Sequence, residues 1–269
     1  MIRLFKAGFL GCGNMGGALA VAAARAVGSE NIAVFDADSE KTRVFCEKNG
    51  TVSTSRDEVV LNSEYIFLGV KPQMLDTLFS EIGETLKNRE KRAVIVSMAA
   101  GVSVESVRTR LKTELPIIRI MPNMPVSVGE GTVLYCADGA TDEEKRGFCE
   151  LMKFSGLTDE LSEDKIDAAS CVSGCGPAFA YMFIEALADG AVACGLPRDK
   201  AIKYAAGTLL GSAKTVLVTG KNPEELKDAV CSPAGSTIEG VFSLEEGGFR
   251  AAAASAVRAA YKKTLELGK

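Results

Sequence analysis

The residues with the clearest chemical meaning form a glycine-rich turn near the start of the chain. Residues 11–16, the glycine turn, read Gly-Cys-Gly-Asn-Met-Gly and lie between an apolar run and an alanine-rich helical pattern. In this GxGxxG spacing Gly11 allows a tight turn, Gly13 lets the backbone approach a pyrophosphate, and Gly16 lets the helix pack against the strand. The negative charge of a dinucleotide would then meet unpaired N–H groups at the start of the helix.

An acidic residue follows at the spacing expected of a ribose ligand. Asp36 ends the second apolar run, twenty residues after Gly16. A carboxylate there accepts a hydrogen bond from a ribose 2′-hydroxyl and repels a 2′-phosphate, which favours NADH over NADPH. Lys41 and Arg43 follow closely and offer positive charge to a 2′-phosphate, although such residues are also typical of a solvated helix face. The sequence alone leaves both cofactors open.

The composition excludes several other chemistries. The chain has no histidine and no tryptophan, so Ser-His-Asp catalysis, histidine general acid–base catalysis and His-ligated zinc are excluded. Its eight cysteines have irregular spacings along 269 residues, which fits reduced thiols better than a disulfide framework. We expect no metal site.

The charge pattern bears on partners and on location. The net charge is −4, with 47% apolar and 25% charged residues, as is ordinary for a folded protein. No cluster of lysine and arginine is available to neutralise nucleic-acid phosphates. We see no run of about 20 uncharged apolar residues and no secretory signal near the start. We therefore expect a cytoplasmic protein without nucleic-acid or membrane partners.

The elements that must position the glycine turn alternate through the first 160 residues. Continuous apolar runs such as residues 66–68 and 94–96 are typical of parallel strands buried on both faces. Strands are expected at residues 6–10, 31–36, 51–53, 65–70, 93–98, 117–121 and 132–136, and helices at 15–27, 40–48, 74–86 and 104–111. This alternation predicts an α/β protein with a Rossmann-like doubly wound parallel sheet.

After residue 161 the pattern becomes helical. Helices are expected at residues 164–170, 177–194, 198–219, 223–230 and 250–267. We therefore predict a dinucleotide-binding domain over residues 1–160 and an all-helical domain over 161–269. The segment 177–194 is apolar on most faces, and a domain this small buries such a helix most easily against a second subunit. A dimer is expected.

Further candidate segments follow the later strands and precede two of the helices. Val70, Lys71 and Pro72 follow the fourth strand, Ala99 the fifth and Asn123 the sixth. The carboxyl ends of parallel strands border the ligand crevice of an open sheet. In the helical half, residues 173–179 and 232–237 are small-residue approaches to helices, and successive backbone N–H groups in such segments make a carboxylate-sized anion site.

Together these segments resemble the pyrroline-5-carboxylate reductase family over nearly the whole chain. The motifs that carry the resemblance are FLGCGNMGGAL, VKPQ, RIMPNMP, SGCGPAF, and LKDAVCSPAGSTIEGV followed by LEEGGFR. It implies a Rossmann domain, a helical domain that forms a dimer or a ring of dimers, and an active site where the nicotinamide meets the partner subunit's helices. It also implies reduction of 1-pyrroline-5-carboxylate to L-proline by NADPH or NADH, the last step of proline biosynthesis.

The resemblance also assigns individual residues. Cofactor contacts would come from Gly11, Cys12, Gly13, Asn14, Met15, Gly16, Asp36, Val70, Lys71, Pro72, Ala99 and Asn123. Substrate contacts would come from Ser232, Gly235, Ser236 and Thr237, with the Thr237 hydroxyl as the catalytic hydrogen-bond partner of the ring nitrogen. The family commonly has SGSGPAY and SPGGTT-like loops, from which Cys175, Phe179, Ala234 and Ser236 depart. Alanine at 234 would either narrow the loop or exclude a positive φ there.

Two other functions remain as alternatives. A β-hydroxyacid dehydrogenase shares this organisation, but its family needs a catalytic lysine on the first long C-terminal helix, and no lysine lies between Lys165 and Lys200. A non-catalytic nicotinamide-binding sensor has no use for a substrate carboxylate site. A protonated cyclic imine accepts hydride without a strong protein acid, so the histidine-free chain is compatible with the reductase function.

Overall fold

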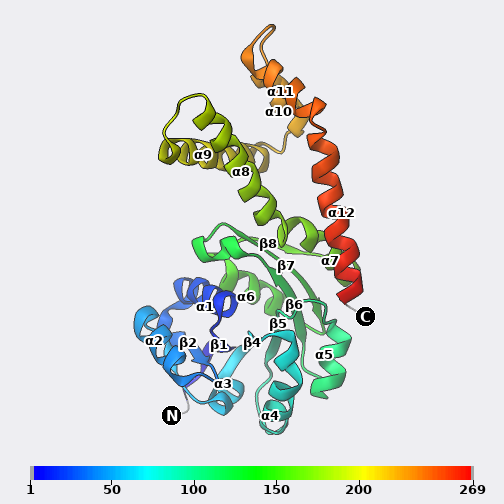
Figure 1. Ribbon diagram of the computed structural model, residues 1–269. Coiled ribbons are helices and arrows are strands. Elements are labelled where there is room, and N and C mark those ends of the chain that lie inside the picture. Colours follow the sequence, from blue (N-terminus) through cyan, green and yellow to red (C-terminus); the bar gives the residue numbers. More distant parts are fainter. Residues whose placement is uncertain (1–2, 268–269) are drawn as a thin grey trace. The chain divides into compact units, whose positions relative to one another are not determined.

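The structure is a computed structural model that describes residues 3–267 (Figure 1). These residues divide into two compact units. The first contains the residues up to Gly174 together with those from Tyr261 onward, and the second is Cys175–Ala260. The boundary expected at residue 160 lies between strand β8 (Gly156–Glu160) and helix α7 (Glu163–Ser173). The compact units divide instead after Gly174, so α7 belongs to the first unit.

The first unit is built on an eight-stranded sheet of order β3-β2-β1-β4-β5-β6-β7-β8. The strands are β1 (Phe5–Leu10), β2 (Ile32–Phe35), β3 (Val52–Ser53), β4 (Ser63–Leu68), β5 (Val94–Ser97), β6 (Ile117–Pro122), β7 (Gly131–Asp138) and β8. The order reverses at β1, because β2 and β4 pair with its two sides. Ligands of open α/β sheets bind at the carboxyl ends of strands beside such a switch point. The Rossmann-like fold is confirmed.

One strand departs from the expected parallel sheet. β7 pairs with β6 in antiparallel register, Ile118 opposite Ala137, whereas the other pairs are parallel. The link between them holds only the short 3₁₀ helix η3 (Met124–Val128). A parallel return requires a crossover of about a dozen residues or more, so a link of this length allows only a hairpin.

Helices cover both faces of the sheet (Figure 1). They are α1 (Asn14–Val27), α2 (Ser39–Asn49), α3 (Arg56–Asn62), α4 (Leu75–Lys87), α5 (Val104–Leu111), α6 (Asp142–Met152) and α7, with short 3₁₀ turns η1 (Ser29–Asn31) and η2 (Pro72–Met74). Helices α3 and α6 and strand β8 were not predicted from the sequence. Both missed helices begin with a capping box, Ser55 with Glu58 and Thr141 with Glu144, and this S/T-x-x-E signal was present in the sequence.

Alternate residues of the strands build two separate cores. Leu10, Leu68 and Ile95 pack with α3, α4, α5 and α7 on one face. Phe9 and Phe67 face the other side, where their rings stack at 4.3 Å and pack with α1 and α6. Burial of both faces explains why the central strands read as continuous apolar runs. The sheet is therefore a rigid base for the turns at its carboxyl edge.

The second unit contains α8 (Gly176–Ala193), α9 (Arg198–Thr219), α10 (Pro223–Val230), α11 (Ser236–Glu246) and the first part of α12 (Phe249–Leu267). Within its described residues, the buried apolar side chains are three alanines, Ala188, Ala201 and Ala205. Large apolar side chains lie on the surface, such as Met182, 69% exposed, and Leu217, 74% exposed. The apolar helix α8 is therefore not buried within a single chain.

The apolar character of α8 also bears on membranes. Residues 163–193 contain an 18-residue window with mean hydropathy 1.3, so by length and composition alone this segment could cross a bilayer. They form two helices, however, and α8 carries the acidic residues Glu185 and Asp189. We interpret the exposed apolar surface of α8 as a contact surface for protein.

Candidate cofactor site and substrate loop

The glycine turn joins β1 to α1 at the switch point of the sheet. Gly11 has φ +106°, and its N–H donates to the Phe35 carbonyl oxygen at 2.7 Å. A Cβ atom at Gly11 would lie 2.6 Å from the Gly69 carbonyl oxygen, and one at Gly16 would clash with the Gly11 carbonyl oxygen. Both positions therefore require glycine, the first for its backbone angle and both for close packing.

Gly13 differs from its neighbours because the space around it is open. A Cβ atom there would meet no other atom within 4 Å, and its φ of −66° and ψ of −172° suit any residue. Gly13 is the N-cap of α1, and neither a side-chain cap nor an acidic residue occupies the first turn. Open space beside uncapped N–H groups at a helix N-terminus fits a pyrophosphate. The residues present thus suit the dinucleotide that the fold implies.

Asp36, at the end of β2, is tied to the glycine turn. Its Oδ2 accepts hydrogen bonds from the backbone N–H of Cys12 at 2.9 Å and from Lys41 Nζ at 2.6 Å. The Cys12 thiol also donates to this carboxylate, at 3.6 Å. Burial, followed by the charge of Asp36, raises the pKa of Cys12 to about 11. Cys12 is therefore a neutral thiol that supports the turn, not a nucleophile.

The other cofactor candidates have different surroundings. Val70 is half-buried, while Lys71 and Pro72 are exposed at the start of η2. Ala99 is 2% exposed, and its methyl group packs in the core. Only the backbone of Ala99 is therefore free for a ligand.

Asn123 has a structural role that the sequence did not suggest. Its side-chain Nδ2 donates to the Ser173 carbonyl oxygen at 2.8 Å, and its Oδ1 accepts from the Thr132 N–H at 2.8 Å. The buried amide thus fixes the loop after β6 to the last residue of α7 and to β7.

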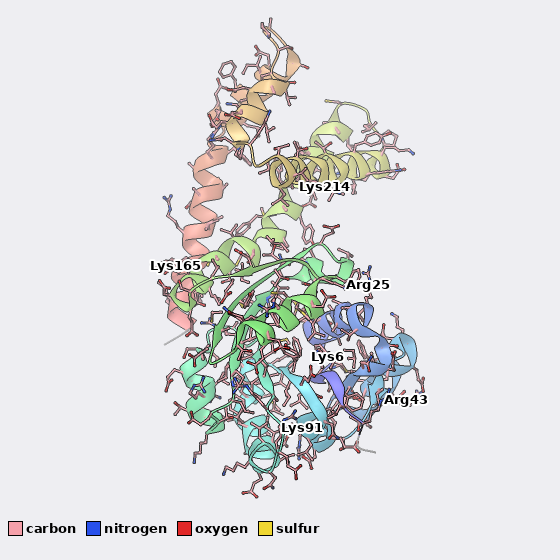
Figure 2. The ribbon with its side chains drawn as sticks, turned by 180° about the vertical axis from the view of Figure 1, so that it is seen from behind. Lys6, Arg25, Arg43, Lys91, Lys165 and Lys214 are labelled. Carbon is pink, nitrogen blue, oxygen red and sulfur yellow. The ribbon has the colours of Figure 1, made fainter. Side chains whose placement is uncertain are left out.

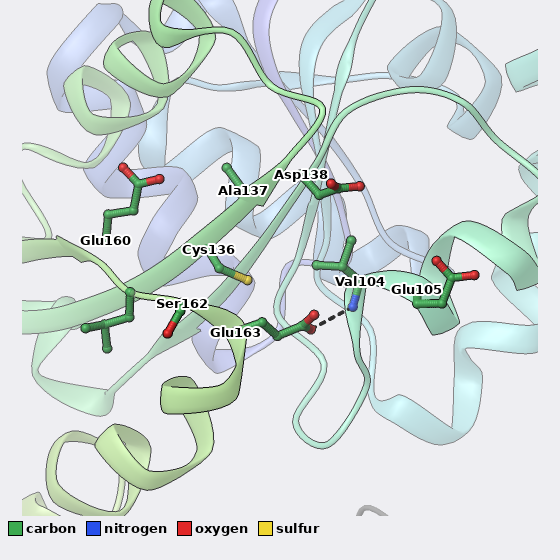
Figure 3. Close-up of a pocket in the computed structure, with 9 residues that line it drawn as sticks. Val104, Glu105, Cys136, Ala137, Asp138, Glu160, Ser162 and Glu163 are labelled. Carbon is green, nitrogen blue, oxygen red and sulfur yellow. Dashed lines mark hydrogen bonds between the residues drawn. The ribbon is translucent and has the colours of Figure 1, made fainter.

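Arg119, in the middle of β6, holds the other end of α7. Its guanidinium, 4% exposed, forms ion pairs with Glu163 at 3.1 Å and Asp167 at 2.6 Å. Glu163 also accepts from the N–H of Val104 at 2.8 Å, the contact drawn in Figure 3. Arg119 is the first residue of the RIMPNMP motif, but no role was predicted for it from the sequence. Together Arg119 and Asn123 fix both ends of α7 to the sheet.

The substrate loop, residues 232–237, lies in the second unit and forms a tight turn before α11. The Gly235 N–H donates to the Ser232 carbonyl oxygen at 3.0 Å, with Pro233 and Ala234 at the corner. Ala234 has φ +55°, which is the sign that the third residue of a type II turn needs. The expectation that alanine would exclude a positive φ here is wrong, because the proline and the closing hydrogen bond impose the turn.

The rest of the substrate loop presents backbone donors to solvent. A Cβ atom at Gly235 would clash with the Ser232 hydroxyl, so this position requires glycine. Gly235 is the N-cap of α11 and provides no side-chain cap. Ser232, Ser236 and Thr237 are exposed. Free N–H groups at the start of a helix suit a small carboxylate.

Grooves elsewhere in the first unit are less suited to a nucleotide. The groove in Figure 3, about 750 Å³, is lined by four carboxylates, those of Glu105, Asp138, Glu160 and Glu163. Its charge opposes an anionic ligand. A smaller groove of about 360 Å³ borders the glycine turn at Cys12, Gly13 and Asn14.

Among the described residues, no group of three or more Cys, Asp or Glu side chains is arranged to hold a metal ion.

Comparisons with family models divide the chain in two. Residues 6–101 match the model described as NADP oxidoreductase coenzyme F420-dependent. Residues 163–267 match the model described as pyrroline-5-carboxylate reductase dimerisation.

Known proteins extend this similarity over the whole chain. Pyrroline-5-carboxylate reductase 3 of Danio rerio is 42% identical over 98% of this chain and 91% of its own length. The Escherichia coli K12 reductase is 39% identical over 98% of both chains.

Solved structures agree with these sequence matches. The Coxiella burnetii pyrroline-5-carboxylate reductase superposes with a TM-score of 0.90 at 30% identity, covering 99% of this chain and 100% of its own. The Plasmodium falciparum pyrroline carboxylate reductase, solved with NADP bound, has a TM-score of 0.85 at 29% identity and covers 100% of both chains. The resemblance seen in the motifs is confirmed, and the chain belongs to the pyrroline-5-carboxylate reductase family.

Proposed function

We propose that this chain is a pyrroline-5-carboxylate reductase that transfers hydride from NADH or NADPH to the C=N bond of 1-pyrroline-5-carboxylate, giving L-proline in the last step of proline biosynthesis. The observation that carries the proposal is that two α-helices, α1 and α11, begin at a glycine N-cap that provides no side-chain cap. One follows the glycine turn and the other the substrate loop. The first suits a pyrophosphate and the second a small carboxylate.

The cofactor site is assigned to the first unit. The bound nicotinamide would supply the hydride. The glycine turn, with Cys12, Asn14 and Met15 between its glycines, would hold the pyrophosphate, and Asp36 the adenosine ribose. The nucleotide would lie along Val70, Lys71 and Pro72, with its nicotinamide end toward the backbones of Ala99 and Asn123.

The substrate site is assigned to the substrate loop. The Ser232 hydroxyl and the N–H groups of Ser236 and Thr237 would hold the carboxylate, beside the backbone of Gly235. A hydrogen bond with the Thr237 hydroxyl would orient the ring nitrogen of the protonated imine. The iminium carbon is already a good hydride acceptor, so the protein mainly aligns the reactants. This explains how a chain without histidine can carry out the reaction.

We also propose that the protein is a cytoplasmic dimer, with a ring of dimers as the larger alternative. The exposed apolar side chains of α8 and α9, including Tyr181, Met182 and Leu210, require a partner surface. The match of residues 163–267 to a dimerisation model supports a second copy as that partner.

The β-hydroxyacid dehydrogenase and sensor alternatives are not favoured. Helix α8 contains no lysine to serve the dehydrogenase reaction. A sensor would not need the turn of the substrate loop, which holds Ala234 at a positive φ.

Substitutions at Thr237 test the proposal. Loss of a hydrogen bond to a charged group costs about 1.5–3 kcal/mol, so Thr237→Ala should lower kcat/KM by about ten- to a hundredfold. The dissociation constant of the cofactor should not change. Thr237→Ser keeps the hydroxyl and should retain most of the activity. If Thr237→Ala left kcat/KM unchanged, Thr237 would not be a site residue.

A further inference from the structure

The surroundings of Asp36 bear on which dinucleotide the protein takes. Its side chain is 15% exposed. Oδ2 accepts from the Cys12 N–H, from the Cys12 thiol and from Lys41 Nζ, and Oδ1 accepts from the Asp38 N–H at 3.2 Å. Each carboxylate oxygen offers about two acceptor positions. One position therefore remains on Oδ1, and a hydroxyl group supplies a donor for it.

The two cations that follow Asp36 most closely in the sequence are already engaged. Lys41 pairs with Asp36 itself at 2.6 Å. Arg43, labelled in Figure 2, pairs with Glu40 at 2.6 Å and with Glu47 at 2.8 Å on its own helix. The Asp38 side chain caps this helix by accepting from the Lys41 N–H at 3.0 Å. Both basic residues that the sequence offered to a 2′-phosphate thus already pair with carboxylates.

We propose that Asp36 and Lys41 together make the protein select NADH over NADPH. The Asp36 carboxylate accepts the hydrogen bond of the adenosine 2′-hydroxyl. By holding Lys41 in an ion pair, it also withholds that ammonium group from a 2′-phosphate. This inference rests on the proposed function, since it assigns a choice of cofactor to the same site.

The ionisation of Asp36 agrees with this role. Burial raises its pKa, but hydrogen bonds from Lys41 and from the Cys12 and Asp38 N–H groups outweigh burial and leave the pKa below its ordinary value. The carboxylate is therefore negative at neutral pH. A 2′-phosphate placed there would meet a like charge in partly desolvated surroundings, beside a lysine that is already paired with the carboxylate.

Cofactor binding to the full chain without substrate tests the proposal. Dissociation constants for NADH and NADPH would be measured from nicotinamide fluorescence with wild type, Asp36→Asn and the double variant Asp36→Asn/Lys41→Gln. Arg43→Gln is the control, because it removes a neighbouring cation that does not touch Asp36. The wild type should bind NADH at least about tenfold more tightly than NADPH.

Asp36→Asn should reduce this preference at least about tenfold, because it removes the like charge and releases Lys41. The double variant should lose the part of the gain in NADPH affinity that depends on the released Lys41. Arg43→Gln should leave the ratio of the two constants unchanged.

Two results would overturn the inference: a wild type that binds NADPH as tightly as NADH, or an Asp36→Asn variant with an unchanged ratio. The ratio of the wild-type dissociation constants tests the proposal even if the Asp36→Asn variant does not fold. Failure to bind either dinucleotide would instead contradict the proposed function itself.

Discussion

The Gly13→Ala substitution separates cofactor binding from folding, because the space around Gly13 is empty in the folded chain. An added Cβ atom would meet nothing within 4 Å, and the backbone angles of φ −66° and ψ −172° suit alanine. Alanine also restricts the unfolded chain. This restriction stabilises by about 0.4–1 kcal/mol, whereas alanine is a poorer N-cap residue than glycine. We therefore expect the free energy of unfolding to stay within about 1 kcal/mol of the wild-type value.

Cofactor binding to the same variant should weaken. The new methyl group would occupy the space through which the pyrophosphate approaches the N–H groups at the start of α1. Loss of one hydrogen bond to a charged group costs about 1.5–3 kcal/mol. This corresponds to a dissociation constant raised by roughly ten- to a hundredfold.

Gly16→Ala is the matched comparison, since a Cβ atom there would clash with the Gly11 carbonyl oxygen. This variant should lose roughly 1–3 kcal/mol of stability. Urea unfolding without cofactor and titration with NADH would measure both effects. A Gly13→Ala protein that binds NADH like wild type would refute the assignment of the pyrophosphate. One that unfolds as easily as Gly16→Ala would refute the packing argument.

Three further predictions concern other parts of the account. Ala234→Gly should keep or raise the free energy of unfolding by up to about 1 kcal/mol, because alanine is strained at φ +55°. Ala213→Gly, at an exposed helical position, should instead lower the free energy of unfolding by about 1 kcal/mol. If the two variants lost equal stability in urea unfolding, alanine would not be strained at position 234. Asn123→Ala should cost roughly 2–4 kcal/mol in the cofactor-free protein, because it leaves the Thr132 N–H and the Ser173 carbonyl oxygen without this partner; unchanged stability would argue against the structural role. The depressed pKa of Asp36, against an ordinary value of 3.8, means that its ionisation stabilises the fold above that pH. The stability difference between wild type and Asp36→Asn should therefore shrink as pH falls through the lowered pKa of Asp36, and a difference that is independent of pH would contradict this linkage.

The sequence predicted the features that depend on local spacing. Gly11 and Gly16 have the backbone angle and the close packing expected of them. The alternation of apolar runs predicted the Rossmann-like sheet. The antiparallel pairing of β7 with β6 follows from the short link between them. The pattern of apolar residues does not indicate strand direction, so it did not predict this pairing.

Contacts between distant residues could not be predicted in this way. Arg119 and Asn123 contact α7 residues more than forty positions along the chain. Nothing in their own segment shows which partners they find. At Ala234 the local prediction was wrong. The backbone preference of alanine disfavours a positive φ, but the turn formed with Pro233 imposes it.

The most direct test of the central claim is turnover of 1-pyrroline-5-carboxylate by the purified chain, with NADH and NADPH followed separately and L-proline quantified. We expect one L-proline for each dinucleotide oxidised, with the higher kcat/KM for NADH. Absence of both dinucleotide oxidation and L-proline formation with either cofactor would contradict the proposed function.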